Sequence, residues 1–481
     1  MNDASNGYGI LATGTYLPRL RLLRSAVVEQ HRWMTQGLKG LAKGGRALGN
    51  WDEDVVTMAV DAGRAVLSSR ACTAIDELTV VSTTFPFADR SNAGVVAGAL
   101  ALPDHALTLD AASSARSTAT ELVRVLAKPT AGEKLLVASE RRAARPASPQ
   151  ELIFGDGAAA VVVGPGEPLA TLVASRVRNA DFVDHFRESG RPYDYGWEER
   201  WVRDEGYMKL LVRTLSDCLA AAEVKAAQVA RFVLPAPIPR INDAVAKKLG
   251  VAQGAVVDAG FESAGDLGAA QVLAMLDRAL RAAAEGELVL LGAFGSGGAA
   301  LLLRRTGKSP APAQPTPPKP EGSYLKYLSF SGQLTPDWGM RAEMDTKTAL
   351  TAAYREVGTV ARLEAGRCKA CGTVQFPRSR VCVNPRCLAT DTQEPKSLVD
   401  VPARVLSHTS DFLGYTPAPP FQFGHVDFEG GGRILMEFTD TDADELRSGL
   451  PVRMVFRIKD LDQRRGFRRY FWKATPVRPA V

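Results

Sequence analysis

The sequence predicts an α/β protein in which a layered N-terminal domain is followed by a small antiparallel β barrel. Up to about residue 305, short β-branched runs such as ELTVVSTT (77–84) alternate with Ala- and Leu-rich segments of helical period, such as residues 267–285. Strand and helix patterns that alternate in this way are typical of a layered α/β domain. From about Asp400, alternating strand patterns are separated by Gly turns, which indicates the barrel.

The composition is that of a globular protein. At 481 residues the chain is too long for one ordinary core and suggests two or three domains. No apolar run approaches the roughly 20 residues needed to span a bilayer, and the first residues show no basic segment followed by an apolar one. We therefore expect a cytoplasmic protein with no membrane partner. The net charge of +6 is a mild excess, which a phosphate-bearing small molecule explains as well as nucleic acid does.

We expect four parts along the chain. Residues 1–305 form the layered domain, and residues 306–323 (TGKSPAPAQPTPPKPEGS) form a proline-rich linker. Because repeated proline stiffens the backbone and removes amide donors, this linker should be a semi-rigid exposed tether. Residues 324–399 contain at least one lead-in helix and a cysteine cluster, and residues 400–481 form the barrel.

The layered domain contains a weak internal sequence repeat. The segments FGDGAAAVVVG (154–164) and FGSGGAALLLR (294–304) each place a Gly-rich turn before a wholly apolar strand. A buried central strand that follows a close backbone approach has this pattern. The repeat fits a duplicated core, and it equally fits the general frequency of Gly turns before buried strands.

Four of the six cysteines fall within twenty residues, in RCKACGTVQFPRSRVCVNPRC (367–387). Two residues separate the first pair, ten follow, and four separate the second pair, so two short knuckles can place four thiolates around a tetrahedral ion. The ligands are Cys368, Cys371, Cys382 and Cys387. This pattern predicts a zinc ribbon, with reduced, metal-free thiols as the alternative. Because all four positions are filled by protein, the zinc is expected to be structural.

The motifs resemble those of two protein families. The string CKACGTVQFPRSRVC and the strands after it resemble the zinc-ribbon/OB-fold proteins that accompany thiolases, over residues 324–481. The N-terminal part resembles the thiolase superfamily, nearest to hydroxymethylglutaryl-CoA synthases and type III ketoacyl synthases. That resemblance is carried, over residues 9–304, by GILATGTYLPRLRL, NWDEDVVTMAVDA, STTFPFADRSNAGVVAGAL and the two Gly-rich segments. It implies a duplicated thiolase-like fold, an OB-fold barrel and a CoA thioester as ligand or substrate.

The resemblance also implies where the catalytic residues should be. The family uses a cysteine five residues after an aspartate, on a strand-to-helix elbow; Asp110 matches the aspartate, and Ala115 stands at the elbow. Pro235 stands where the family has a histidine, and Phe261 stands where it has an asparagine. None of these side chains can attack a thioester, move a proton or bind an oxyanion, so the usual Claisen mechanism is absent.

Other nucleophiles do not restore that mechanism. A one-residue shift would bring Ser114 onto the elbow, but a serine without its histidine has no activating base. Cys72 and Cys218 are expected to be small buried core residues.

Two functions from different classes remain. In the first, the chain catalyses aldol or retro-aldol chemistry on a β-hydroxyacyl-CoA, which needs a base and enolate-stabilising donors but no covalent acyl step. Arg116, Glu262 and Asp266 are the candidates for these roles, with a structural pairing of Arg116 and Asp266 at helix starts as the alternative. In the second, the chain is a catalytically silent scaffold that binds CoA esters for a partner thiolase. The aromatic and charged residues 193–207 are read as an active-site cap or as a dimer contact.

A basic and aromatic segment near the C-terminus is the candidate CoA-binding region. It contains Arg464, Arg465, Arg468 and Arg469 beside Phe467, Tyr470, Phe471 and Trp472. Arginines there suit phosphates, with an aromatic ring against the adenine. Single-stranded nucleic acid on an OB fold and a solvated strand pair are the alternatives, and the thiolase-like companion favours CoA. Because thiolase-fold domains pair, we expect a homodimer or a hetero-oligomer with a thiolase-like subunit.

Overall fold

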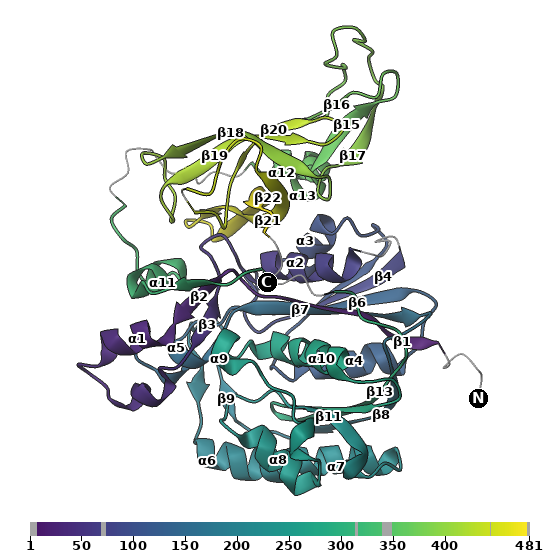
Figure 1. The fold of residues 1–481 in the computed structure, drawn as a ribbon, viewed down its shortest axis with the longest axis vertical. Helices are drawn as coiled ribbons and strands as arrows, with labels where there is room; N and C mark the ends of the chain where they lie inside the picture. The colour runs from purple at the N-terminus through teal and green to yellow at the C-terminus, as the bar shows by residue number, and fades with distance from the viewer. Residues whose placement is uncertain (1–6, 69–73, 313–315, 339–348, 443, 479–481) are drawn as a thin grey trace. The chain divides into compact units, whose positions relative to one another are not determined.

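The computed structural model describes residues 7–68, 74–312, 316–338, 349–442 and 444–478 (Figure 1). The chain divides into two compact units. Unit 1 comprises Met1–Gly49, Met58–Ala97 and Leu102–Tyr324, and unit 2 comprises Asn50–Thr57, Gly98–Ala101 and Leu325–Val481. Cys72 lies outside the described residues. Within the described part, no helix has both the length and the apolar character that a membrane crossing requires.

Nine strands of unit 1 form one sheet in the order β11-β12-β13-β8-β1-β7-β6-β4-β5. Their bounds are β1 Tyr8–Tyr16, β4 Ile75–Val81, β5 Leu107–Ala111, β6 Glu133–Glu140, β7 Gly157–Pro165, β8 Ala170–Asn179, β11 Val229–Val233, β12 Leu288–Phe294 and β13 Gly297–Arg305. Smaller strands are β2 Leu20–Leu23, β3 Gly45–Leu48, β9 His185–Phe186, β10 Tyr195–Gly196 and β14 Lys319–Glu321. The helices are α1 Arg24–His31, α2 Val55–Leu67, α3 Asn92–Ala99, α4 Ser117–Ala127, α5 Pro149–Ile153, α6 Glu199–Trp201, α7 Val212–Ala221, α8 Ile241–Leu249, α9 Phe261–Ala264 and α10 Gln271–Ala282.

The sheet consists of two halves with the same pairing pattern. Strand β7 is antiparallel to both β1 and β6, and β6 is parallel to β4. In the second half, β13 is antiparallel to both β8 and β12, and β12 is parallel to β11. The two Gly-turn strands, β7 and β13, therefore occupy equivalent central places, and the duplicated thiolase-like layout that the sequence predicts is confirmed. The halves meet through the pairing of Ile10 with Ala170.

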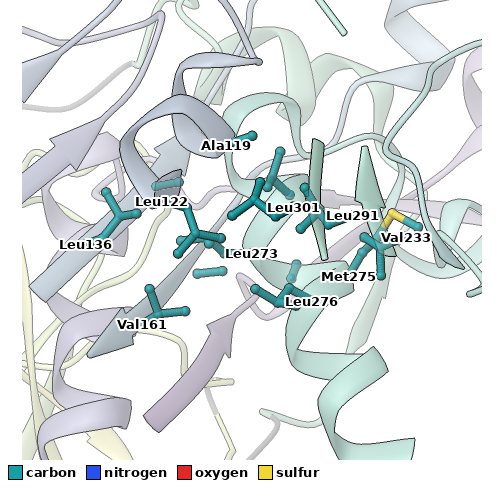
Figure 2. Close-up of a cluster of buried hydrophobic side chains, with 14 of the residues drawn as sticks. Ala119, Leu122, Leu136, Val161, Val233, Leu273, Met275, Leu276, Leu291 and Leu301 are labelled. Carbon is teal, nitrogen blue, oxygen red and sulfur yellow. The ribbon is translucent and has the colours of Figure 1, made fainter. Parts of the chain in front are cut away.

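Helices α4 and α10 lie between the two halves (Figure 1). Figure 2 shows Leu122 of α4 and Leu273 of α10 in the same cluster as Leu136 of β6 and Leu301 of β13. Helix α10 is buried at almost every position from Gln271 to Leu280, as expected for a helix that is covered by sheet on both sides. A second cluster packs α7 and α8 on the outer face of the second half. The layered α/β architecture is thus confirmed.

The proline-rich segment differs from the expected free tether at its C-terminal end. Strand β14 pairs in parallel with β2, and the Lys319 amide donates to the Arg19 carbonyl at 2.8 Å. Strand β14 is an edge strand, where a proline such as Pro320 is tolerated because its missing amide is not needed by a further neighbour. The contacts of unit 1 therefore continue to Tyr324, whose hydroxyl donates to the Glu151 carboxylate at 2.8 Å.

Unit 2 combines short helices, a three-stranded sheet and a five-stranded antiparallel sheet. The helices are α11 Tyr324–Phe330, α12 Leu350–Arg355 and α13 Val357–Arg362, and the smaller sheet contains β15 Glu364–Cys368, β16 Val374–Gln375 and β17 Gln393–Ser397. The larger sheet, in the order β20-β19-β18-β21-β22, contains β18 Ala403–Asp411, β19 Phe421–Phe428, β20 Arg433–Glu437, β21 Pro451–Asp462 and β22 Phe467–Pro476. The predicted antiparallel barrel region is confirmed.

Candidate functional site

The strand-to-helix elbow of the nucleophile position is present, but it carries no nucleophile. Strand β5 ends at Ala111, α4 begins at Ser117, and Ala115 lies in the turn between them. Ser113 has φ of 144°, a conformation that costs a non-glycine residue energy and that occurs most often at functional sites. The turn therefore retains a specialised backbone shape, with a methyl group at the elbow.

Arg116 connects this elbow to the turn between β12 and β13 through hydrogen bonds. Its Nε donates to the Gly295 carbonyl at 2.7 Å, and its Nη2 donates to the Ser296 carbonyl at 3.3 Å. A Cβ at Gly295 would lie 3.2 Å from the Ser114 Oγ, so the close approach depends on glycine. Burial lowers the pKa of Arg116. The structure therefore gives this guanidinium group two backbone partners.

The other two predicted catalytic residues have separate partners. Glu262 forms an exposed ion pair with Lys43 at 2.9 Å, and the neighbouring Phe261 ring lies under the guanidinium of Arg24. Asp266 accepts from Arg142 at 2.9 Å, and both side chains are largely buried. In the described part of the chain, no hydrogen bond or ion pair joins any two of Arg116, Glu262 and Asp266. They do not form one catalytic set.

A buried polar cluster instead surrounds Arg142. Its guanidinium donates to the Asp266 carboxylate and carbonyl and lies over the Phe154 ring. Glu140, at the end of β6, is fully buried and accepts from the Ser82 hydroxyl at 3.2 Å. Burial lowers the pKa of Arg142, but the carboxylates of Asp266 and Glu140 outweigh burial and raise it overall. The Nε of Arg142 is buried without a hydrogen-bond partner.

Two hydrogen-bond paths connect this cluster to the elbow. The Ser82 amide donates to the carbonyl of Ala111, the last residue of β5, while the Ser82 hydroxyl donates to Glu140. On the other side, Thr118 of α4 donates to the Ala269 carbonyl at 2.8 Å, and the Ala269 amide donates to Glu140 at 3.4 Å. The cluster therefore adjoins the position from which the nucleophile is missing.

A histidine and an aspartate form a pair that is close enough to Arg142 for its charge to act on the histidine. The Nδ1 of His185 lies 2.7 Å from the Asp184 carboxylate, and the imidazole is 40% exposed. The hydrogen bond with Asp184 raises the pKa of His185, Asp194 raises it further, and Arg142 opposes the rise. The sequence analysis missed this pair, because an isolated Asp-His dipeptide is common on protein surfaces. The adjacency of Asp184 and His185, shortly before the segment 193–207, was the available signal.

A π-helix carries a buried tyrosine whose pKa responds to carboxylates of the same region. This helix, η4 (Val202–Leu211), has a hydrogen-bond pattern that is rare and is found mainly at functional sites. Tyr207 is buried against Phe294, with 4.7 Å between ring centroids. Burial raises the pKa of Tyr207, and the carboxylates of Asp184 and Asp266 raise it further, so the phenol is neutral and can donate a hydrogen bond. Tyr207, the last residue of the segment 193–207, therefore lies within the electrostatic influence of Asp184 and Asp266.

The four clustered cysteines lie together in unit 2. Their Sγ atoms all lie within 4.8 Å of one another, with 3.9 Å between Cys368 and Cys387 and 3.6 Å between Cys371 and Cys382. Four thiolates at about 2.3 Å from a tetrahedral zinc are separated by roughly 3.8 Å, so the donor set fits this metal. Cys218, by contrast, is a single buried thiol, and burial raises its pKa to about 11.

The backbone and hydroxyl groups around the sulfurs suit a thiolate site. The Gly372 amide donates to the Cys368 carbonyl at 2.8 Å and closes the first knuckle, where Gly372 has φ of 76°. The Thr392 hydroxyl lies 3.2 Å from the Cys368 sulfur, and the Asn384 amide lies 3.7 Å from the Cys371 sulfur. The wider second knuckle still brings its two sulfurs into the cluster. Hydrogen-bond donors around ligand atoms orient metal ligands.

Three of the four arginines expected to meet CoA phosphates have carboxylate partners. Arg469 lies opposite Asp460 in the β21–β22 pairing and donates to it at 2.7 Å, and Arg465 pairs with Asp462. Arg468 reaches Asp54 at 2.7 Å. Successive strand residues point to opposite faces, which sends neighbouring arginines to different partners. The structure therefore does not gather the four guanidinium groups into one phosphate site; Arg464 lies exposed on the connecting turn.

Comparison with known protein families matches both the α/β domain of unit 1 and the zinc ribbon and antiparallel sheet of unit 2. Residues 219–304 match the family 3-oxoacyl-[acyl-carrier-protein] synthase III C terminal. Residues 355–393 match the ChsH2 rubredoxin-like zinc ribbon domain, and residues 402–457 match the ChsH2 C-terminal OB-fold domain. The chain joins a thiolase-like domain to a ChsH2-type zinc ribbon and OB fold.

Related sequences align with the thiolase-like domain. The hydroxymethylglutaryl-CoA synthase of Aeropyrum pernix is 26% identical over 298 residues, which cover 60% of this chain and 82% of that protein. The β-ketoacyl-[acyl-carrier-protein] synthase III of Psychromonas ingrahamii is 29% identical over 315 residues, or 60% of this chain and 96% of that protein.

Solved structures show the same fold. A hydroxymethylglutaryl-CoA synthase complexed with CoA has a TM-score of 0.56 at 18% identity, covering 63% of this chain and 83% of that one. The 3-oxoacyl-(acyl carrier protein) synthase III of Pseudomonas aeruginosa has a TM-score of 0.55 at 21% identity, covering 64% of this chain and all of that one.

Proposed function

We propose that this chain acts at a carbon–carbon bond of a CoA thioester without forming a covalent acyl-enzyme. The observation that carries the proposal is the buried Arg142–Asp266 pair, whose charges act on the pKa of His185 and of the buried Tyr207, beside an elbow that holds Ala115. A CoA thioester is supported by the hydroxymethylglutaryl-CoA synthases among the relatives. Of the four arginines near the C-terminus, we keep Arg464 as the proposed phosphate contact because it lies exposed on a turn.

The proposed reaction is aldol cleavage of a β-hydroxyacyl-CoA, or its reverse. Neutral His185, held by Asp184, takes the proton from the β-hydroxyl group, and the electron pair of that O–H bond forms the carbonyl of the released aldehyde or ketone. The Cα–Cβ bond breaks, and its electron pair becomes the enolate of the shortened acyl-CoA. The Tyr207 phenol and the Arg142 guanidinium are the proposed donors to the enolate oxygen. Protonation of the enolate carbon completes the cleavage.

We assign a structural zinc to Cys368, Cys371, Cys382 and Cys387. Four protein thiolates fill a tetrahedral shell, so the ion supplies cross-linking of the ribbon and no open position for a substrate. The ribbon match and the sulfur separations support this assignment.

We also propose that the chain pairs with a second thiolase-like subunit, as a homodimer or a hetero-oligomer. Strand β5 is at the edge of the sheet, and its Leu107 and Leu109 are exposed. An edge strand with exposed apolar residues is available for pairing with another chain.

A silent scaffold is the second candidate. The observation that favours it is the absence of a reactive group at all three family positions, Ala115, Pro235 and Phe261. In that case the chain would bind CoA esters for a cysteine-bearing partner.

The test is to incubate the full-length chain with a panel of β-hydroxyacyl-CoA compounds and to follow products and intact protein mass by mass spectrometry. We expect a shortened acyl-CoA, a carbonyl product and no covalent adduct on the chain. His185→Gln should remove the activity, whereas His105→Gln, at an exposed histidine outside the cluster, should not. An acyl adduct on this chain would refute the mechanism, and turnover only with a cysteine-bearing partner would establish the scaffold role.

A further inference from the structure

A groove of about 480 Å³ lies on the surface of unit 1 and is lined in part by the segment 193–207. Its walls are Asp181, Phe182, Val183, Trp197, Glu198 and Trp201. None of these residues belongs to the polar cluster, and the proposed reaction does not use them.

The walls of the groove present large aromatic faces. Trp201 stacks parallel to Phe182 at 5.9 Å, and Phe294 packs edge-on against Phe182 at 5.5 Å, which holds the stack in place. Trp197 and Trp201 are 52% and 47% exposed. Two tryptophan side chains exposed to this degree in the lining of one groove are typical of contact sites for another molecule.

The rim of the groove is acidic. Asp181 and Glu198 are exposed, and in the described part of the chain neither carboxylate makes an ion pair or a side-chain hydrogen bond. A second groove on the other side of Trp201 differs, because its Lys209 pairs with Glu205 and its Arg178 pairs with Asp217. The first groove thus combines aromatic faces with two carboxylates that have no counter-charge.

The aromatic surface extends beyond the groove. Phe186 and Tyr195, packed at 5.3 Å, are 53% and 57% exposed, and Tyr195 packs beside Trp197. A single small cation would leave most of this apolar surface in water, whereas a polypeptide segment can cover it. Arginine and lysine are attracted to the faces of tryptophan rings, and arginine also stacks on them.

We propose that this groove docks a segment of a partner protein, which inserts an arginine or lysine side chain between Trp197 and Trp201. The carboxylates of Asp181 and Glu198 neutralise the inserted cation, and the flanking apolar residues of the segment cover Val183, Phe186 and Tyr195. The charge complementarity between two unpaired carboxylates and the inserted cation selects a basic partner segment over a neutral or acidic one.

The test uses the full-length chain labelled with 15N at tryptophan, whose six indole signals are assigned by Trp→Phe variants. The probe is acetyl-Leu-Arg-Leu-amide, compared with the same peptide containing citrulline, which has the same shape and no charge. We expect saturable shifts of the Trp197 and Trp201 signals with the arginine peptide at up to about 10 mM and a much smaller response to citrulline. The double variant Asp181→Asn/Glu198→Gln should weaken binding by about three- to fivefold, whereas Glu199→Gln should not.

The opposite results would overturn the docking site. Absence of shifts at the two tryptophans, equal responses to arginine and citrulline, or full binding by the double variant would each refute it. If tetramethylammonium saturates the same tryptophan signals at the same concentration, the groove binds small organic cations and the partner-segment proposal is refuted. Each readout is independent of catalysis, so its failure leaves the proposed reaction unaffected.

Discussion

The Lys473 ammonium group lies 3.0 Å from the carboxylate of Asp52, although 421 positions separate the two residues in the sequence. Both side chains are buried, and Lys473 also contacts Glu437 at 3.0 Å. Two neighbouring acids of the same segment have similar partners in unit 2: Glu53 faces Arg457 at 3.3 Å, and Asp54 faces Arg468 at 2.7 Å. The segment Asn50–Thr57 is therefore held in unit 2 by a row of ion pairs whose carboxylates are all buried.

Removal of one partner from this row should destabilise unit 2 strongly. Lys473→Met leaves Asp52 buried without its cation and removes one of the two lysines that contact Glu437, and the loss of one member of a buried pair costs about 3–5 kcal/mol. The matched control is Arg433→Met, which breaks the exposed Arg433–Asp427 pair on the same sheet and should cost less than about 1 kcal/mol. Urea unfolding followed by tryptophan fluorescence measures both. Equal losses in the two variants would contradict the buried-pair argument.

The stability of unit 2 should fall in acid because of Glu437. Burial raises the pKa of Glu437, but Lys473 and Lys459 outweigh burial and lower it below the ordinary 4.5. A carboxyl group with a lowered folded-state pKa contributes stability above its unfolded-state pKa and loses that contribution as the pH falls through the folded-state value. Unfolding midpoints measured between pH 7 and pH 3 should therefore decrease, and Glu437→Gln should flatten this decrease. A slope that Glu437→Gln leaves unchanged would exclude this residue as the source.

The purified chain should contain about one zinc per molecule, measured by elemental analysis without chelators. Cys371→Ser should lower the zinc content and increase protease cleavage within residues 364–397, because the metal cross-links the two knuckles. Cys218→Ala removes a buried thiol from unit 1 and should keep the full zinc content. If zinc-free protein resists cleavage as well as the zinc-bound protein does, zinc has no structural role in this ribbon.

The proposed base predicts the pH dependence of activity. His185 must be neutral to accept a proton, and its hydrogen bond with Asp184 raises its pKa above the ordinary 6.5. The rate should therefore increase with pH and reach half its maximum above pH 6.5. Asp184→Asn removes the main cause of the rise, so its profile of kcat/KM against pH should move to lower pH. A profile that the substitution does not move would assign the titration to another group.

The elbow should depend on Arg116 without a direct chemical role for that side chain. Arg116→Ala removes the donors to the Gly295 and Ser296 carbonyls and should lower the thermal midpoint of unit 1. Arg116→Lys keeps the charge but offers no planar pair of donors, so it should recover only part of the loss. Thermal unfolding and cleavage activity should decrease in the same order of variants. Full stability with lost activity would return Arg116 to the list of catalytic candidates.

Several features of this protein follow from the sequence alone, since they depend on short-range patterns. Alternating apolar periods indicated the layers, and the spacing of Cys368, Cys371, Cys382 and Cys387 predicted a site of four neighbouring sulfurs. The two Gly-turn segments were compatible with duplicated halves, which the strand pairing then established. Period, turn and ligand spacing act over a few neighbouring residues, so they can be read without knowledge of the distant chain.

Only the tertiary structure decided which charges meet. The ion pairs of Arg142 with Asp266 and of Arg468 with Asp54 join segments far apart in sequence, and no local pattern predicts such contacts. The catalytic roles expected for Arg116 and Glu262 and the single phosphate site expected for the C-terminal arginines changed for the same reason, because the fold gives these side chains other partners. A charged side chain takes whichever partner the fold brings within a few ångströms, and burial makes that partner obligatory, because an unpaired charge in the interior costs several kcal/mol.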